Sequence, residues 1–141
     1  MKNVLFLSLL LNAVIMLNAQ DSWKVYHNKT EFLTGTDESK SKNSISISAA
    51  SLKMSGELVI TYIEKEPQKD WGRFIAVFDN HDNELLQRKS LRILKVSNAV
   101  LKDLFKKSTT LHIYSWSLPN DPDLAARIRI RRVHLCTIEL K

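Results

Sequence analysis

The sequence has few of the residues on which disulfide-linked and nucleotide-binding domains depend. It holds one cysteine, three glycines and three prolines in 141 residues. A single cysteine cannot form a disulfide within the chain, which excludes the disulfide-rich class of small domains. Three scattered glycines cannot build a glycine-rich phosphate-binding loop. A chain of this length can instead be stabilised by its own hydrophobic core.

Long hydrophobic runs are also missing, except at the N-terminus. Residues 4–17 are apolar apart from two polar positions, follow a lysine, and lead to the small residue Ala19. This pattern is typical of a secretory signal peptide, and the run is too short to cross a membrane as a helix. We predict a signal peptide at residues 1–19, cleavage after Ala19, and a single β-rich domain at residues 20–141. The expected location is secreted or periplasmic, with no membrane span.

The leader MKNVLFLSLLLNAVIMLNAQ resembles those of exported proteins of Bacteroidota, and WSLPNDPDLAARIRIRRVHLC has the look of a family signature. The resemblance implies an address outside the cytoplasm and carries over no functional residue.

Neither sign of charge dominates the chain. Lysine and arginine together number 21, aspartate and glutamate 15, and the formal net charge is +6. Such a modest excess favours polyanion binding only where the cations gather on one surface. Because the chain is expected to be exported, we expect no nucleic-acid partner, whereas an anionic polymer outside the cytoplasm stays open.

The pattern that dominates after the leader is alternation of apolar and polar residues. In Ser44–Ser48, for example, isoleucines alternate with serines. A period of two predicts strands with one buried face. Such strands are predicted at 23–27, 44–48, 57–66, 74–79, 84–89, 90–96, 110–116 and about 126–140. The sequence therefore predicts an all-β fold, a β-sandwich of about seven or eight short antiparallel strands, with an α+β layer as the alternative.

One segment has helical spacing instead. Ser97 is a suitable N-cap, and two lysines, Lys106 and Lys107, suit the C-terminal end. Apolar residues between them form one stripe, made of Val100, Leu101, Leu104 and Phe105. We predict one short helix of roughly three turns here.

The closing segment RIRIRRVHLC holds the lone cysteine beside a histidine. On one strand, His134 and Cys136 are two residues apart and are expected to share a face. A cysteine nucleophile needs a neighbouring base and an orienting group, and the surrounding aliphatic residues disfavour a thiolate. The sequence favours a packed core cysteine and no catalytic residue.

The turn DNHDNE, residues 79–84, offers Asp79, His81, Asp82 and Glu84 as oxygen and nitrogen donors. It lacks the glycine and the spacing of a calcium-binding loop. Asparagine and aspartate between two apolar runs are what a hairpin turn requires. We therefore predict a turn and no metal or cofactor.

Aromatic side chains offer a possible binding surface. Trp116 and Tyr114 share one strand face with His112, and Trp71 begins a strand, where it is the tryptophan best placed for partial exposure. Trp71, Trp116 and Tyr114 are therefore candidates for stacking on a sugar, although large aromatics also fill sandwich cores.

Strict alternation after the last loop gives the arginines a common side. Arg127, Arg129 and Arg131 are expected on one strand face, with Ile128 and Ile130 opposite. Arginines spaced about 6.6 Å apart suit carboxylate, sulfate or phosphate groups. The alternative is a solvated face that protects an edge strand from pairing.

Three functions follow from these patterns. The leading hypothesis is a non-catalytic exported β-sandwich that acts as an interaction module for a protein or envelope component. The first alternative is a carbohydrate or anionic-glycan binding protein that uses the candidate tryptophans and arginines. The second is a small hydrolase or redox protein that uses Cys136 with His134, so the enzyme question stays open.

Overall fold

The computed structural model describes residues 20–90 and 92–141, and these residues form a sandwich of two β-sheets. The elements are β1 (Ser22–His27), β2 (Thr30–Gly35), β3 (Ser44–Ile47), a 3-10 turn (Ser51–Lys53), β4 (Glu57–Ile63), β5 (Trp71–Phe78), β6 (Glu84–Ser90), β7 (Ile93–Ser97), α2 (Asn98–Lys107), β8 (Thr110–Pro119), α3 (Pro122–Ala125) and β9 (Val133–Leu140). The predicted β-sandwich is confirmed, with nine strands in the described residues. The predicted signal peptide, residues 1–19, lies outside them.

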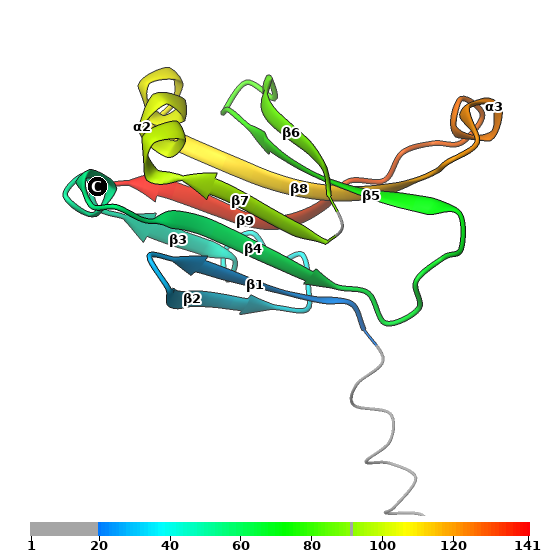
Figure 1. Cartoon of the computed structure of the whole chain (residues 1–141), viewed down its shortest axis with the longest axis horizontal. Helices are drawn as coiled ribbons and strands as arrows, with labels where there is room; N and C mark the ends of the chain where they lie inside the picture. The colour runs from blue at the N-terminus through cyan, green and yellow to red at the C-terminus, as the bar shows by residue number, and fades with distance from the viewer. Residues whose placement is uncertain (1–19, 91) are drawn as a thin grey trace, which may run out of the picture.

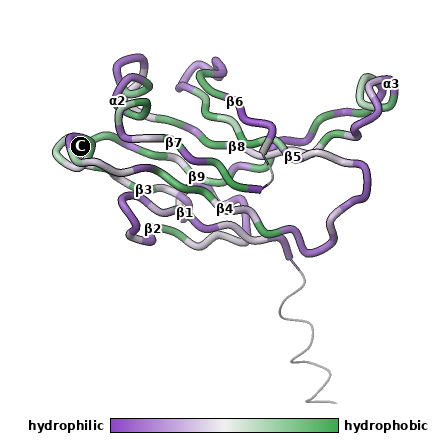
Figure 2. Tube along the Cα trace, in the orientation of Figure 1, coloured by the Kyte–Doolittle hydropathy of each residue, from purple (hydrophilic) through white to green (hydrophobic). Residues whose placement is uncertain are grey.

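The two sheets lie one behind the other (Figure 1). The four-stranded sheet has the order β2-β1-β4-β7 and the five-stranded sheet the order β3-β9-β8-β5-β6. All neighbours are antiparallel except β3, which runs parallel to β9 and so departs from the prediction. Both sheets contribute to one buried core, which includes Val25, Ile60, Leu94, Ile75, Ile113 and Ile138. The hydrophilic residues gather in the connections, above all in the loop from β4 to β5 (Figure 2).

Helix α2 closes one end of the sandwich, which we call the α2 end. The Ser97 hydroxyl accepts a hydrogen bond from the Val100 amide at 3.3 Å, as an N-cap does. Leu101, Leu104 and Phe105 are buried, and the helix contacts β4, β7 and β8, so it bridges both sheets. The predicted helix is confirmed, although Val100 is 41% exposed and lies outside the buried stripe.

A buried amide network completes the α2 end. Asn98 Oδ1 accepts a hydrogen bond from His27 Nε2 at 2.9 Å, and Asn98 Nδ2 donates to Asn28 Oδ1 and to the Met54 carbonyl, each at 2.9 Å. Gly56 is required beside it, because a Cβ there would lie 1.9 Å from Asn28 Oδ1. Every polar atom of the Asn98 side chain therefore has a protein partner.

The predicted strand from about Ala126 to Leu140 is wrong in its first half. Strand β9 begins at Val133, and residues 127–132, which we call the arginine arm, have no neighbouring strand. Alternation alone cannot make a strand without a pairing partner. The arm is held by ion pairs to loops instead, Arg131 to Glu38 and Arg132 to Asp82. Ile130 is 49% exposed rather than facing a core.

Within the described residues, we find no helix with the length and apolarity needed to cross a membrane.

Candidate functional site

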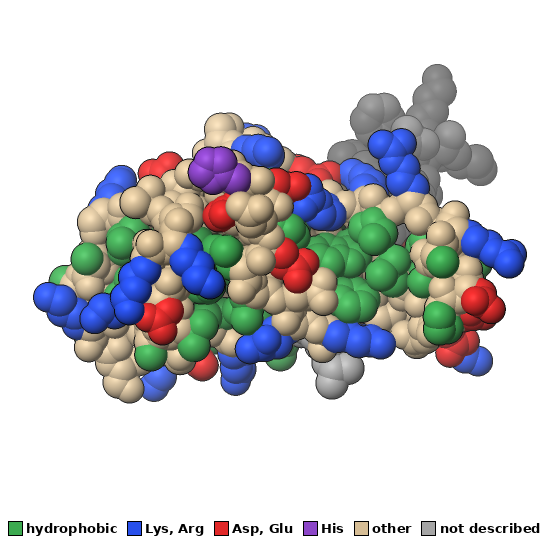
Figure 3. Space-filling model, turned by 90° about the horizontal axis from the view of Figure 1, so that it is seen from above, with side chains coloured by type: hydrophobic (Ala, Val, Ile, Leu, Met, Phe, Trp, Pro, Cys, Tyr) green, Lys and Arg blue, Asp and Glu red, His purple; other side chains and the backbone are tan. Residues whose placement is uncertain are grey.

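The end of the sandwich opposite α2 contains an open cleft, which we call the Trp71 cleft. Here β4 ends, β5 and β7 begin, and β8 runs into the loop that leads to α3 (Figure 1). The cleft has a volume of about 710 Å³. It is lined by Glu64, Gln68, Trp71, Gly72, Arg73, Lys89, Arg92 and Asn120. Seen from above, exposed hydrophobic side chains in the α3 half of the molecule have both Lys or Arg and Asp or Glu side chains around them (Figure 3).

Trp71 differs from the other two tryptophans in its surroundings. Trp23 is buried, stacks on another ring, and donates its indole N–H to the Leu135 carbonyl at 2.8 Å. Trp116 is 7% exposed and stacks on Phe74 with ring centroids 5.7 Å apart. Trp71 is partly exposed, and no aromatic ring of the described chain stacks on it. The expectation that Trp71 is the most accessible tryptophan is confirmed.

A carboxylate and two arginines organise the wall of the Trp71 cleft. Glu64 pairs with Arg73 through Nε and with Arg92 at 3.6 Å. Arg73 is further fixed because its Nη1 donates to Ser115 Oγ at 2.8 Å and its guanidinium lies 3.9 Å from the Tyr62 ring centre. The Arg92 side chain is half exposed. Arg73 is therefore a rigid part of the wall, whereas Arg92 can reach a ligand.

Gly72 forms the floor of the Trp71 cleft, where the absence of a side chain leaves room for two neighbouring groups. A Cβ on Gly72 would lie 3.0 Å from Lys89 Cε and 3.3 Å from Asn120 Oδ1. Glycine thus lets the Lys89 side chain and the Asn120 amide approach the backbone closely on one face of the strand. The cleft then holds three cations against one carboxylate, with Gln68 and Asn120 as neutral hydrogen-bonding groups.

A second, smaller cavity lies beyond the Arg73–Glu64 pair. Its volume is about 220 Å³, and Asp21, Glu64 and Glu66 are among its lining residues. Asp21 accepts a hydrogen bond from the Tyr62 hydroxyl at 2.8 Å, and burial together with this bond raises the pKa of Tyr62. The two cavities share four lining residues, Glu64, Gln68, Trp71 and Arg73, so the acidic groups Asp21 and Glu66 adjoin the cleft. The part of the cleft lined by Lys89 and Arg92 is the part suited to anions.

The other two aromatic candidates lie on the outer face of the five-stranded sheet. Trp116 is packed with Ala76 and Phe78 in a second buried cluster, against which Phe74, Tyr114 and Leu118 are partly buried. We call these six residues the outer-face strip. Tyr114 keeps some exposure, whereas Trp116 is buried and stacks on Phe74, its cross-strand partner.

The three candidate arginines do not form the expected stripe. Arg129 and Arg131 line a cavity of about 540 Å³ together with Tyr114, Ile130 and Arg132. Arg131 Nη2 donates to Glu38 Oε2 at 2.6 Å, so its charge is paired. Arg127 is exposed and is not part of this cavity. The candidates from the sequence are thus divided between two cavities and a buried cluster, except Arg127, which lies in none of them.

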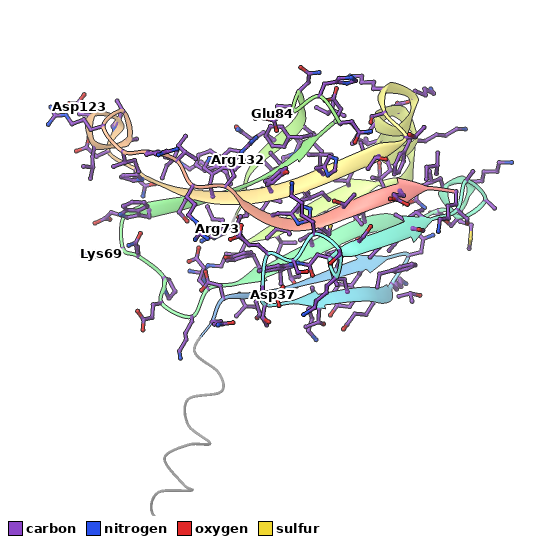
Figure 4. The ribbon with its side chains drawn as sticks, turned by 180° about the vertical axis from the view of Figure 1, so that it is seen from behind. Asp37, Lys69, Arg73, Glu84, Asp123 and Arg132 are labelled. Atoms are coloured by element: carbon purple, nitrogen blue, oxygen red, sulfur yellow. The ribbon has the colours of Figure 1, made fainter. Side chains whose placement is uncertain are left out.

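Sequence reasoning missed Arg132. Its guanidinium donates two hydrogen bonds to Asp82, both 3.0 Å long, and lies 4.8 Å from the Tyr114 ring centre and 4.9 Å from that of Phe78. It lies above the β8 ribbon in Figure 4, whereas Arg73 lies on the other side. The sequence around Arg132 could not predict this ion pair, because Asp82 belongs to the β5–β6 turn, which is distant in sequence.

Sequence reasoning also missed Glu64, Lys89, Arg92 and Asn120, which lie in loops or near strand ends. The one local signal was the Trp71-Gly72-Arg73 triplet at a strand start. A small residue between two large ones indicates that something approaches the backbone there.

His134 and Cys136 do not share a face, contrary to the expectation. The register of β8 and β9 shifts between Ile113 and Tyr114, so His134 pairs with Tyr114 while Cys136 pairs with Ile113. This bulge at Leu135 turns Cys136 into the core and His134 to the outer face. Burial raises the pKa of the Cys136 thiol. The arrangement offers no activated thiolate.

The outer face carries a hydrogen-bonded histidine chain near the α2 end. The distances are 2.9 Å from Asn80 Oδ1 to His112 Nε2, 3.0 Å from His112 Nδ1 to Thr137 Oγ1, and 2.9 Å from Thr137 Oγ1 to His134 Nε2. Because Asn80 Oδ1 accepts, the hydroxyl donates to His112 and accepts from His134. His134 Nδ1 is left buried without a partner. Burial lowers the pKa of His134 to about 4, so both rings are neutral at neutral pH.

The DNHDNE turn forms its own hydrogen bonds. Asp79 accepts from the His81 and Asn83 amides at 2.8 and 2.9 Å, and from the Asn83 side chain. In residues 20–90 and 92–141, no three His, Cys, Asp or Glu side chains are grouped to hold a metal ion.

Comparisons of the chain with protein families, with curated proteins and with solved structures found no match.

Proposed function

We propose that the protein is a non-catalytic binding module, acting outside the cytoplasm, that holds an anionic glycan in the Trp71 cleft. The observation that carries this proposal is the composition of the cleft. A partly exposed, unstacked indole stands beside three cations, two amides and one carboxylate. This combines two functions predicted from the sequence, an exported interaction module and an anionic-glycan binder. A protein partner stays a prediction.

The charges favour an anionic ligand. Glu64 neutralises part of the charge of Arg73 and Arg92, and Lys89 has no acidic partner among the described residues that line the cleft. Arginine and lysine bind carboxylate and sulfate groups, with strength that falls as salt rises. The net charge of the cleft supports uronate or sulfate groups over neutral sugars.

The remaining groups favour a saccharide. An exposed indole face offers a flat apolar surface with polar edges, which suits the C–H face of a pyranose ring. Gln68 and Asn120 can donate and accept hydrogen bonds, as the hydroxyl groups of a sugar require.

The arrangement of the carboxylates supports binding rather than glycoside hydrolysis. Hydrolysis needs two carboxyl groups across the scissile bond, one of them able to carry a proton. Among the described residues that line the Trp71 cleft, Glu64 is the one carboxylate, and it is paired with Arg73 and Arg92 rather than facing a second carboxyl group.

Calorimetric titration of the purified protein with oligogalacturonides, sulfated disaccharides and neutral cellobiose tests the proposal. We expect the acidic ligands to bind, with affinity falling between low and physiological salt, and cellobiose to bind at least tenfold more weakly. Trp71→Ala should lower the affinity for the acidic ligand at least tenfold, and Lys89→Gln should reduce its dependence on salt.

Matched controls are Phe32→Ala, an exposed aromatic at the opposite end, and Lys95→Gln, an exposed lysine of β7. Both should leave the affinity unchanged. The proposal is overturned if no acidic saccharide binds, if Trp71→Ala binds like the unmodified protein, or if cellobiose binds as tightly as the acidic ligands.

A further inference from the structure

We propose that the ligand is a chain of several anionic sugar units, which runs from the Trp71 cleft along the outer-face strip to a second anion subsite at Arg129. This inference rests on the proposed function and deepens it, because it assigns a polymer rather than a single sugar. It also gives a binding role to the arginine arm, which the Trp71 cleft does not use.

The strand register places the Gly72 part of the Trp71 cleft and the cavity of the arginine arm on the same face of the sheet. Trp71 and Arg73 alternate with Gly72 and point to the opposite face, so a chain bound at Trp71 would reach the outer face across Gly72, which has no side chain. Along β5 and β8, cross-strand pairs on the outer face follow in the order Gly72–Leu118, Phe74–Trp116 and Ala76–Tyr114. Gly72 is the floor of the Trp71 cleft, and Tyr114 lines the cavity of the arginine arm. Four residues of β8 separate the first pair from the third, about 13 Å at strand spacing. That separation suits an oligosaccharide.

The path between the two cavities is continuous in its contacts. Lys89 lines the Trp71 cleft and also lies 6.0 Å from the ring centre of Phe74. Phe74 stacks on Trp116, whose ring lies 6.4 Å from that of Phe78. Arg132 covers the far end. Trp116 and Phe78 are buried, whereas Phe74 and Tyr114 are partly exposed, so these two rings are where sugars can stack while their acidic groups meet Lys89 and Arg132.

The unpaired charge at the far end belongs to Arg129. Arg131 is paired with Glu38 and Arg132 with Asp82, both from loops that flank the arm. No acid of the described chain lies within ion-pair distance of Arg129. The two ion pairs are solvent-exposed contacts of the arm with neighbouring loops, and they leave the Arg129 guanidinium unpaired beside Tyr114 and Ile130. An unpaired guanidinium beside an aromatic ring is suited to an anion.

The test is a length series of oligogalacturonides, from two to eight units, titrated against the unmodified protein, Arg129→Gln and Arg127→Gln. The last variant is the control, because Arg127 is an exposed arginine of the same arm that does not line the cavity. We expect affinity to rise about tenfold between the dimer and the longest chains. Arg129→Gln should abolish that rise without changing the affinity for the dimer, and Arg127→Gln should keep it.

The outcomes separate this inference from the proposed function. If the dimer binds and Trp71→Ala abolishes its binding, but affinity does not rise with length or both arginine variants behave alike, the second subsite is wrong and the Trp71 cleft stands. If neither dimer nor long chain binds, both proposals fail. Both also fail if long chains bind equally well to Trp71→Ala, because no chain then spans the two cavities.

Discussion

The two ends of the sandwich are closed in opposite ways. At the α2 end, buried leucines and Phe105 fill the gap between the sheets, and the Asn98 amide satisfies the polar groups around it. At the Trp71 end, Arg73 and Glu64 close the gap, and a cleft with an accessible indole opens beside them. One end is sealed by apolar packing and the other by charges that keep solvent contact. The side chains at the α2 end are packed or hydrogen-bonded within the protein, whereas the Trp71 end has groups available for a ligand.

Loss of packing at the α2 end should cause the largest change in stability. Leu101 is fully buried, so Leu101→Ala leaves a cavity and should lower the free energy of unfolding by about 4 kcal/mol. Urea denaturation measures this change. Val100→Ala on the exposed side of the same helix should change it by less than about 0.5 kcal/mol. Equal effects of the two variants would show that α2 does not seal the sandwich.

Acid should weaken the half of the five-stranded sheet nearer α2. The pKa of His134 is about 4 in the folded protein and 6.5 ordinarily, so the unfolded chain binds more protons between these values. Stability should be intact above about pH 6.5 and fall by up to about 3 kcal/mol as the pH drops to 4. Denaturation at stepped pH measures the slope.

His134→Gln should flatten that slope, and the exposed His81→Gln should not. A slope unchanged by His134→Gln would assign the acid sensitivity to other groups.

Breaking the Arg73–Glu64 ion pair at the Trp71 end should lower the free energy of unfolding by less than Leu101→Ala does. Arg73→Met leaves Glu64 partly buried with only the longer contact to Arg92, for a loss of about 2 kcal/mol. The double variant Arg73→Met with Glu64→Leu should recover most of it, because two apolar side chains need no partner. Thermal unfolding of both variants decides this, and a double variant less stable than the single one would contradict it.

Removing the N-cap of α2 should have the smallest effect on stability among these variants. Ser97→Ala removes the side chain that caps the Val100 amide and should lower stability by about 1 kcal/mol. Ser97→Asp restores an acceptor and should match the unmodified protein. Chemical denaturation of the pair distinguishes a lost cap from a general effect of changing the end of β7.

Local patterns were predictable from the sequence, and contacts across the chain were not. The α2 cap and the β5–β6 hairpin depend on neighbouring residues, so spacing and turn chemistry were sufficient to find them. The bulge at Leu135 is invisible to alternation, yet it separates His134 from Cys136. The arginine arm alternates like a strand, but only the partners of Arg131 and Arg132 decide its course. Trp71 was found, whereas the charged residues of its cleft come from four places in the chain: Arg73 in β5, Lys89 near the end of β6, and Glu64 and Arg92 in two different connections.

The parallel pairing of β3 with β9 has a consequence for when the protein can fold. β9 follows the other eight described strands in the sequence, yet it lies inside its sheet, between β3 and β8. β3 pairs with no other described strand, so it stays unpaired until β9 has been synthesised. A sheet ordered in this way disfavours early folding during translation, and contacts so distant in sequence form slowly.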